Sequence, residues 1–281
     1  MKQHKNIHLS VKDYLVSGEI FDLVYNIELD LLSTSPMPST ADLAKYYESK
    51  DYISHTDGKN SLISLLYQWV KKWSLSKKTE LITKRNGAIG DLLDVGAGTG
   101  DFLNVAKEKG WKVEGMEPNS NASKLASEKG IDLKPTLSHF EGRQFDVVTL
   151  WHVLEHVPNL EETITQLSKL IKPDGVLVVA VPNYKSYDAN HYGKFWAAYD
   201  VPRHLWHFSK KSIERIFGEN FKLEATKPML FDSFYVSLLS EKYKGGSTFS
   251  MKAILIGLLS NLKALRSKEY SSHIYCFRKT V

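Results

Sequence analysis

Short apolar runs alternate with amphipathic stretches in the middle of the chain. The runs "DLLDV", "WKVEGME", "FDVVTL" and "VLVVAVP" are apolar almost throughout, and a weaker run lies near "IDLKP". Between them, "DFLNVAKEKG", "NSNASKLASEKG" and "NLEETITQLSKLIKPDG" carry apolar residues at helical spacing. Continuous apolar strands that alternate with helices are typical of a parallel sheet covered on both faces. The pattern therefore predicts an α/β fold.

The flanking regions show other patterns. Residues 1–80 lack the alternation, and "SPMPSTADLAKYYES" and "NSLISLLYQWVKKWSL" predict helices, the second with an apolar stripe that ends at Trp73. We therefore expect a helical N-terminal extension that covers the site, followed by a ligand-binding domain at 81–281. Within that domain we predict an aromatic lid at 184–208 and a helical insertion at 241–270, before a closing strand "SSHIYCFRK".

Composition excludes several classes of protein. The chain has 281 residues, of which 42% are hydrophobic, so it can bury a large core and is not disordered. A net charge of +5 is too mild for a nucleic-acid footprint. Cys276 is the only cysteine, which excludes a disulfide framework and a cysteine-based zinc site. Without a leader or a membrane-spanning run, we expect a cytoplasmic protein.

A glycine-rich turn in "LLDVGAGTGDF" indicates a ligand site. Gly96, Gly98 and Gly100 lie between the first predicted strand and its helix, at the sheet edge where ligands bind. Glu117 follows the second strand, about 20 residues on, where an acidic residue holds ribose hydroxyls. The spacing G-x-G-x-G, followed by Asp101, suits a pyrophosphate poorly. It favours a cationic adenosine ligand, S-adenosylmethionine, over a nicotinamide dinucleotide.

The segment "WHVLEHVPN" contains the pattern H-x-x-E-H, formed by His152, Glu155 and His156. One family of zinc proteases uses this pattern, but on a helix long enough to set both histidines on one face. Here it follows a buried strand directly, and Pro158 leaves room for only one helical turn. We therefore predict no metal site. The side chains instead lie beside the glycine turn, or hydrogen-bond within their own turn.

Together these motifs resemble the class I S-adenosylmethionine-dependent methyltransferases, in particular the small-molecule branch that includes ubiquinone-biosynthesis-like enzymes. The resemblance rests on "LLDVGAGTGDFL", "VEGMEPN", "FDVVTLWHVLEHVPN" and "IKPDGVLVVAVPN", in that order. It covers 91–183 strongly and "VPRHLWHFSKKSIERIF" more loosely. It implies a Rossmann-like, seven-stranded, mostly parallel and doubly wound sheet, and methyl transfer from S-adenosylmethionine with S-adenosylhomocysteine as product.

The resemblance also implies residue roles. The cofactor would be bound by the glycine turn and by residues after the second and fourth strands: Asp94, Gly96, Ala97, Gly98, Gly100, Glu117, Pro118, Trp151 and His152. The methionine end would lie against the turn and the ribose against Glu117. The family usually offers a carboxylate to the adenine after the third strand, and here Thr136, Leu137 or Ser138 stand in that place.

The acceptor site is expected under the aromatic segment 184–208. Aromatic walls suit a small planar or lipid-like acceptor and exclude water. A base would assist transfer to a hydroxyl or amine, and we predict His152, His204 and Arg203 as the catalytic residues. Tyr47, Tyr52 and His55 of the extension would close the other side.

Other functions stay open at this stage. An RNA- or tRNA-modifying methyltransferase is the first alternative, and the lysines of "KKWSLSKKTE" would then bind RNA rather than lie on a solvated helix face. A nicotinamide-dependent oxidoreductase and a non-catalytic binding protein are the others. The segment "MKAILIGLLSNLKAL" packs on the sheet or on a second copy, or it touches a membrane. We favour a monomer or homodimer without nucleic acid and disfavour membrane contact.

Overall fold

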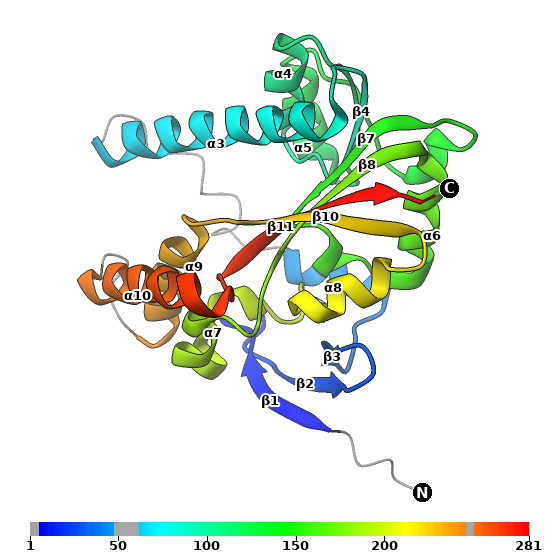
Figure 1. The fold of residues 1–281 in the computed structure, drawn as a ribbon. Coiled ribbons are helices and arrows are strands. Elements are labelled where there is room, and N and C mark those ends of the chain that lie inside the picture. Colours follow the sequence, from blue (N-terminus) through cyan, green and yellow to red (C-terminus); the bar gives the residue numbers. More distant parts are fainter. Residues whose placement is uncertain (1–5, 48–61, 246–249, 281) are drawn as a thin grey trace, which may run out of the picture.

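Seven strands form the central sheet of the computed structural model, which describes residues 6–47, 62–245 and 250–280 (Figure 1). They are β4 (Asp91–Val95), β5 (Lys112–Met116), β6 (Leu133–Lys134), β7 (Phe145–Trp151), β8 (Ile171–Pro182), β10 (Phe221–Pro228) and β11 (Ser272–Lys279). Their order is β10-β11-β8-β7-β4-β5-β6. The strands from β8 to β6 are parallel, and only β11 runs antiparallel to its neighbours. The prediction of a mostly parallel, seven-stranded sheet is confirmed.

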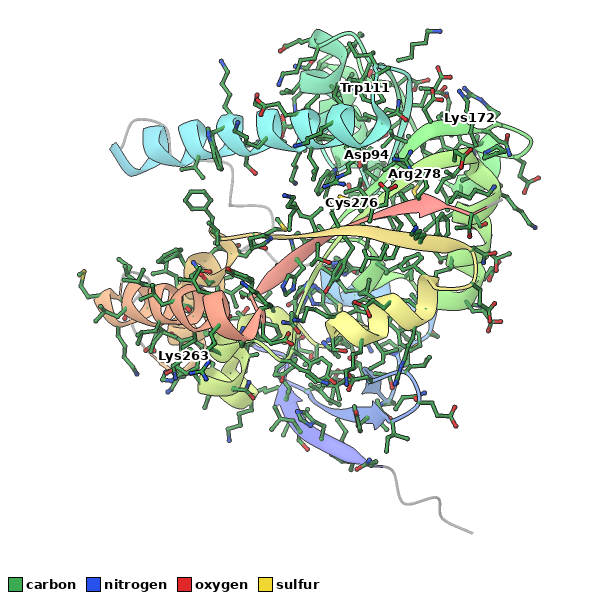
Figure 2. All side chains as sticks on the ribbon, in the orientation of Figure 1. Asp94, Trp111, Lys172, Lys263, Cys276 and Arg278 are labelled. Carbon is green, nitrogen blue, oxygen red and sulfur yellow. The ribbon has the colours of Figure 1, made fainter. Side chains whose placement is uncertain are left out.

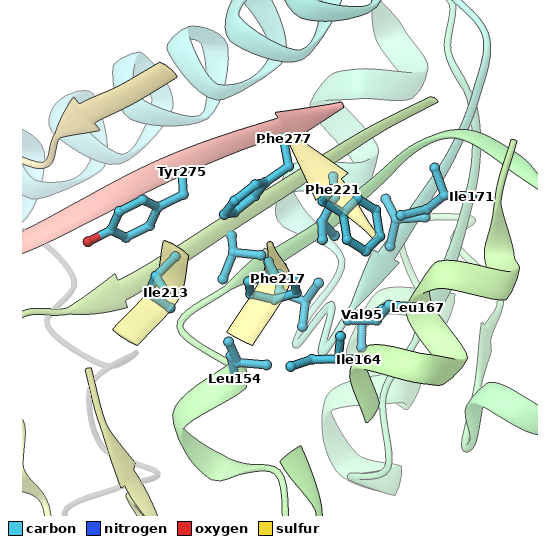
Figure 3. Close-up of a cluster of buried hydrophobic side chains, with 14 of the residues drawn as sticks. Val95, Leu154, Ile164, Leu167, Ile171, Ile213, Phe217, Phe221, Tyr275 and Phe277 are labelled. Carbon is cyan, nitrogen blue, oxygen red and sulfur yellow. The ribbon is translucent and has the colours of Figure 1, made fainter. Parts of the chain in front are cut away.

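Helices cover both faces of this sheet. The helices on one face are α3 (Leu62–Asn86), α4 (Asp101–Glu108) and α5 (Ser120–Ser127), and those on the other are α6 (Leu160–Leu170) and α8 (Lys210–Phe217). Successive strand residues point to opposite faces, so Val147 packs under α3 and α4 while Val148 packs towards α6. Figure 3 shows the second of these cores, where Phe217 of α8 meets Phe277 of β11. The sheet is therefore doubly wound, as predicted.

The predicted helical extension is wrong over residues 7–35, which form three strands. These are β1 (Ile7–Lys12), β2 (Ile20–Asn26) and β3 (Leu31–Ser35), and with β9 (Trp206–His207) they make a separate four-stranded antiparallel sheet. Alternation in β2, where Phe21 and Leu23 are buried, is the strand signal. The signal is weak because each strand is short and half exposed.

Helices follow the third strand, as expected. The first is α1 (Thr40–Leu43), continued by the 3-10 turn η1 (Ala44–Tyr47), and the Ser39 hydroxyl accepts a hydrogen bond from the Asp42 amide at 3.2 Å. Tyr52 and His55 lie outside the described residues. In α3 the predicted inward residue Trp73 is 43% exposed, so the buried stripe runs instead through Thr79 and Ile82.

Two segments lie at the carboxyl edge of the sheet. Residues 184–208 form α7 (Tyr187–Tyr192), the 3-10 turns η5 (Gly193–Phe195) and η6 (Ala197–Tyr199), and β9. The second segment is a helical hairpin of α9 (Asp232–Tyr243) and α10 (Met251–Ser267). The predicted insertion at 241–270 therefore begins too late, because α9 starts at Asp232. No helix among the described residues is long and apolar enough to cross a bilayer.

Candidate active site

The glycine turn connects β4 to α4 in a backbone conformation that only glycine adopts easily. Gly96, Gly98 and Gly100 have φ values of 70°, 54° and 72°. A Cβ atom at Gly96 would lie 2.5 Å from Cγ2 of Val153, whereas a Cβ at Gly98 would meet nothing within 4 Å. The turn thus packs against Val153, two residues after β7, and among the described residues it leaves open space at Gly98, as a loop that cradles a ligand must.

Glu117 spans the gap between β5 and this turn. Its Oε2 accepts a hydrogen bond from the Gly98 amide at 2.8 Å, and its Oε1 accepts one from the Asn119 amide at 2.9 Å. A carboxylate has about four acceptor positions, so two remain for hydroxyl donors. Pro118 is exposed beside it. The structure therefore places the Glu117 carboxylate beside the glycine turn, which is the position required for the predicted hydrogen bonds to ribose hydroxyls.

The adenine side of the turn is exposed. Thr136 precedes the 3-10 turn η3 (Leu137–Phe140), and its hydroxyl lies 2.8 Å from that of Ser138 and 2.9 Å from Nδ1 of His139. These polar groups satisfy one another, and the structure does not test whether one of them contacts a ligand.

Asp94 lies buried at the end of β4 (labelled in Figure 2). Burial raises the pKa of its carboxyl group to about 7, although a 2.6 Å hydrogen bond from Thr149 and the charge of Lys78 oppose that rise. The carboxyl group is therefore poised between its two forms at neutral pH. A cation bound beside it would favour the ionised form.

Lys78 is a site residue that the sequence analysis placed on a solvated face. Its ammonium lies 4.2 Å from the centroid of the Trp151 ring, and burial lowers its pKa while Asp94 and Asp232 oppose that shift. Lys78 lies one turn from the buried Ile82 on the same stripe of α3, which is the signal that could have found it. Nε1 of Trp151 is buried and has no partner among the described residues.

His152 follows β7 with a φ of 58°, which is rare for a residue other than glycine. Its Nδ1 lies 3.2 Å from Oε1 of Glu155, and its Nε2 lies 3.2 Å from Oδ2 of Asp232 in α9. Burial alone would lower the pKa of His152, but these two carboxylates raise it to about 10. At neutral pH the ring is thus a cation that donates to both carboxylates. It has no lone pair with which to act as a base, so its predicted role as a base gains no support.

A cavity of about 520 Å³ opens next to His152. Its polar lining includes Asp232 and His204, and most of its apolar lining comes from η6 and α9: Ala197, Ala198, Val236, Leu239 and Tyr243. Segment 184–208 therefore forms part of the wall. Its largest aromatic side chains do not, because Trp196 is buried and donates a 2.8 Å hydrogen bond to Asp188.

His204 and Arg203 are neighbours in sequence but differ in setting. Nδ1 of His204 lies 2.9 Å from the Ala198 carbonyl and therefore carries a proton that it donates there. In the neutral ring Nε2 is then an acceptor at the cavity wall, 4.0 Å from Oδ2 of Asp200. Arg203 is buried, and its guanidinium donates to Asp200, Asp13 and the Tyr46 carbonyl at 2.7 to 3.0 Å. It does not line the cavity of His152. This geometry gives Arg203 no contact with an acceptor.

Glu155, His156 and His204 bring three possible ligand atoms within 4.8 Å of one another. Of the H-x-x-E-H residues, Glu155 and His156 lie on the short 3-10 turn η4 (Leu154–His156) and His152 precedes it, so the motif is not on a long helix, as expected. Burial lowers the pKa of His156 to about 4, and Oε2 of Glu155 is buried without a partner among the described residues. These groups could accept a divalent cation. The prediction of no metal site therefore stays untested.

Residues 70–226, more than half of the chain, match the family model described as a methyltransferase domain. The chain belongs to this methyltransferase family. The region matched begins in α3 and ends in β10, so it includes the glycine turn, Glu117 and His152 but neither α9 nor α10.

Curated relatives of this methyltransferase-domain chain carry the name ubiquinone biosynthesis O-methyltransferase. One from Haemophilus ducreyi is 35% identical over 116 residues, which is 36% of this chain and 49% of the relative. Another, from Rickettsia bellii, is 30% identical over 158 residues, or 50% of this chain and 65% of the relative. The chain thus spans about half to two thirds of the length of these relatives.

A solved structure from Burkholderia thailandensis has the same fold. It is a 1,6-didemethyltoxoflavin-N1-methyltransferase with bound 1,6-didemethyltoxoflavin and S-adenosylhomocysteine, and the TM-score is 0.54. The alignment covers 96% of this chain and 100% of that one, at 15% sequence identity. At this identity the likeness concerns the fold.

Proposed function

We propose that this protein is an S-adenosylmethionine-dependent methyltransferase that acts on a small-molecule acceptor. The proposal rests on two features that lie together at the carboxyl edge of the sheet. Glu117 bridges to the open glycine turn at Gly98, and the cavity at His152 begins directly after the neighbouring strand β7. A cofactor held at the turn would present its reactive end to whatever fills that cavity.

The residues at the turn fit this cofactor. Glu117 would accept hydrogen bonds from the ribose hydroxyls, and Asp94 would face the cationic methionine end. The buried Nε1 of Trp151 is a donor without a partner in the part of the chain that the structure describes. The bound cofactor supplies a methyl group activated by a sulfonium. The protein's own contribution is alignment of the acceptor.

The cavity supports an acceptor with an apolar body and a hydroxyl group. Its walls are mainly apolar, and its volume of about 520 Å³ suits one drug-sized ring system. The names of the curated relatives also favour transfer to oxygen. Nε2 of His204 would take the proton of the acceptor hydroxyl, and the His152 cation with Asp232 would orient it. Arg203 would act as a structural strut, and segment 184–208 as the lid.

Calorimetric titration with S-adenosylhomocysteine tests the cofactor site. We expect binding by the wild type and a dissociation constant raised about tenfold or more in Glu117→Ala, because two ribose hydrogen bonds to a charged acceptor are lost. Glu114→Ala is the matched control, since Glu114 lies on the same strand and pairs only with the exposed Arg143 among the described residues. No heat with folded wild-type protein, or equal affinities for all three proteins, would overturn the proposal.

Transfer itself is tested with radiolabelled cofactor and a set of hydroxylated aromatic acceptors. His204→Ala should lower kcat by about a hundredfold or more while S-adenosylhomocysteine still binds normally. Binding of NADH in place of S-adenosylhomocysteine would favour the oxidoreductase alternative. We propose a cytoplasmic location for the enzyme.

A further inference from the structure

Helix α10 buries small side chains and exposes large apolar ones, which is the reverse of the usual distribution. Its buried residues are mostly small: Ala253, Gly257, Ser260 and Ala264. The large apolar side chains point to solvent and are between 41% and 64% exposed: Met251, Leu255, Leu258, Leu259, Leu262 and Leu265. Five of these recur at spacings of four and three residues, which places them on one face of the helix. We call this set the leucine face.

Close packing explains the small residues on the inner side. A Cβ atom at Gly257 would lie 2.8 Å from the Phe234 ring, so α10 presses against α9 at this point. Ser260 donates a 2.6 Å hydrogen bond to the buried Asp188 of α7. The inner side of α10 therefore seats it on the protein without any leucine. The leucine face contributes nothing to the core, and a contiguous exposed apolar surface indicates an interaction site.

Basic residues border the leucine face. Residues 250–268 contain Lys252, Lys263, Arg266 and Lys268 but no aspartate or glutamate. Lys252 and Lys263 are eleven residues apart, or three turns, and so lie on the same side of the helix. Lys252 pairs with Glu241 of α9 at 3.2 Å, so Lys263 and Arg266 carry most of the positive charge of this border. Lys263, labelled in Figure 2, projects from α10 and lies 3.8 Å from the centroid of the Tyr187 ring. A cationic border beside an apolar stripe matches a surface of anionic headgroups over acyl chains.

The leucine face continues into other exposed apolar residues. The Leu230 carbonyl accepts a 2.9 Å hydrogen bond from the side-chain amide of Asn261, which holds the start of α9 against α10. The adjacent Phe231 is 49% exposed and meets Trp73 of α3 edge to face at 5.8 Å. Aromatic side chains of this kind favour the boundary between headgroups and acyl chains. Exposed apolar side chains thus occur at the start of α9 and on α3 as well as on α10.

We propose that the leucine face and its basic border form a docking surface for an anionic lipid bilayer. The helix would lie in the plane of the interface, since at 17 residues it is an amphipathic surface helix and not a membrane span. Charge decides against a second copy of the chain as the occupant, because a symmetric contact would bring two basic borders together. The inference stands on α10 and is independent of the proposed methyl transfer.

Vesicle flotation tests the proposal with the full chain. Wild-type protein should float with vesicles made of equal parts phosphatidylcholine and phosphatidylglycerol, should bind about tenfold less to phosphatidylcholine alone, and should lose binding as salt rises. Leu258→Glu/Leu262→Glu should bind the mixed vesicles at least about tenfold more weakly. The matched control is Ile27→Glu, which places the same charge on an exposed isoleucine far from α10 in sequence and should bind like the wild type.

A charge variant provides a second arm. Lys263→Gln/Arg266→Gln should weaken binding to the mixed vesicles and leave the residual binding to phosphatidylcholine unchanged. Circular dichroism checks that each variant is folded. Two results would overturn the proposal: folded wild-type protein that stays unbound with both vesicle types, or a dimer in solution that Leu258→Glu/Leu262→Glu dissociates while vesicle binding is unaffected.

Discussion

Arg203→Met distinguishes a structural role of Arg203 from a catalytic one. The guanidinium is buried between Asp13, which follows β1, and Asp200, which follows η6. It also donates to the Tyr46 carbonyl after α1. It therefore joins the small antiparallel sheet to the segment that lines the acceptor cavity. Methionine has a similar reach but no charge, so the substitution leaves Asp13 buried without its cationic partner.

The expected loss of stability in Arg203→Met depends on the hydrogen bonds that Asp13 retains. Removing one partner of a buried ion pair costs about 3–5 kcal/mol. Asp13 still accepts hydrogen bonds from the Leu15 and Ser17 amides at 3.0 and 2.8 Å, which argues for the low end, about 3 kcal/mol. At about 2–4 °C for each kcal/mol in a domain of this size, the melting temperature should fall by about 6–12 °C.

Differential scanning calorimetry and urea unfolding measure this loss. The matched control is Arg215→Met, because Arg215 is exposed and contacts only backbone carbonyls of Ile27 and Glu28 among the described residues; its unfolding free energy should change by less than about 0.5 kcal/mol. In the double variant Asp13→Asn/Arg203→Met the buried charge is gone, so much of the loss should be recovered.

The pH dependence gives an independent check on the same pair. Burial alone would raise the pKa of Asp13, but hydrogen bonds from Ser17 and Arg203 lower it below its ordinary 3.8. The stabilisation is thus present above that value and is lost as the pH falls through the lower folded pKa. If Arg203→Met melted like the wild type at neutral pH while kcat fell steeply, Arg203 would contact the acceptor and the strut interpretation would be wrong.

Three further predictions concern the sheet and its turn. Burial raises the pKa of Asp94 to about 7, so affinity for S-adenosylmethionine should fall about tenfold per pH unit below that value. In Asp94→Asn the affinity should depend little on pH, and a wild-type affinity that is constant from pH 5 to 8 would contradict the prediction. Gly96→Ala should destabilise the protein by about 1–3 kcal/mol more than Gly98→Ala in urea unfolding, since only the first new Cβ meets Val153; equal losses would refute the argument. Burial also raises the pKa of the Cys276 thiol to about 11, so a thiol reagent should label it only in denaturant, and rapid labelling of native protein would show otherwise.

Local patterns in the sequence were enough to predict the sheet and the glycine turn. Strands such as β8 are apolar on both faces, and Gly96, Gly98 and Gly100 lie in the turn between β4 and α4, where all three adopt positive φ. The small sheet was missed for a physical reason. Strand β3 completes its pairing with β9, about 170 residues away in sequence, and no local pattern encodes such a partner.

The residues of the candidate site that escaped prediction depend on tertiary contacts. Asp232 reaches His152 from a helix 80 residues further along the chain, and this contact changes the charge of the imidazole. Arg203 appeared suited to catalysis because it precedes His204 in a polar, aromatic segment. Its partner Asp13 lies 190 residues away and turns it inward. Sequence position alone gives neither the protonation state of His152 nor the burial of Arg203.

About half of the residues that line the cavity at His152 lie outside the stretch that matches the methyltransferase family model. Leu15 follows β1, Asp232 and Tyr243 belong to α9, and all three lie beyond residues 70–226. The surface that would meet a substrate is therefore only partly encoded in the region that the family shares. Replacement of residues 235–243 of α9, with Asp232 retained beside His152, should therefore change which molecules are accepted while S-adenosylhomocysteine still binds as before.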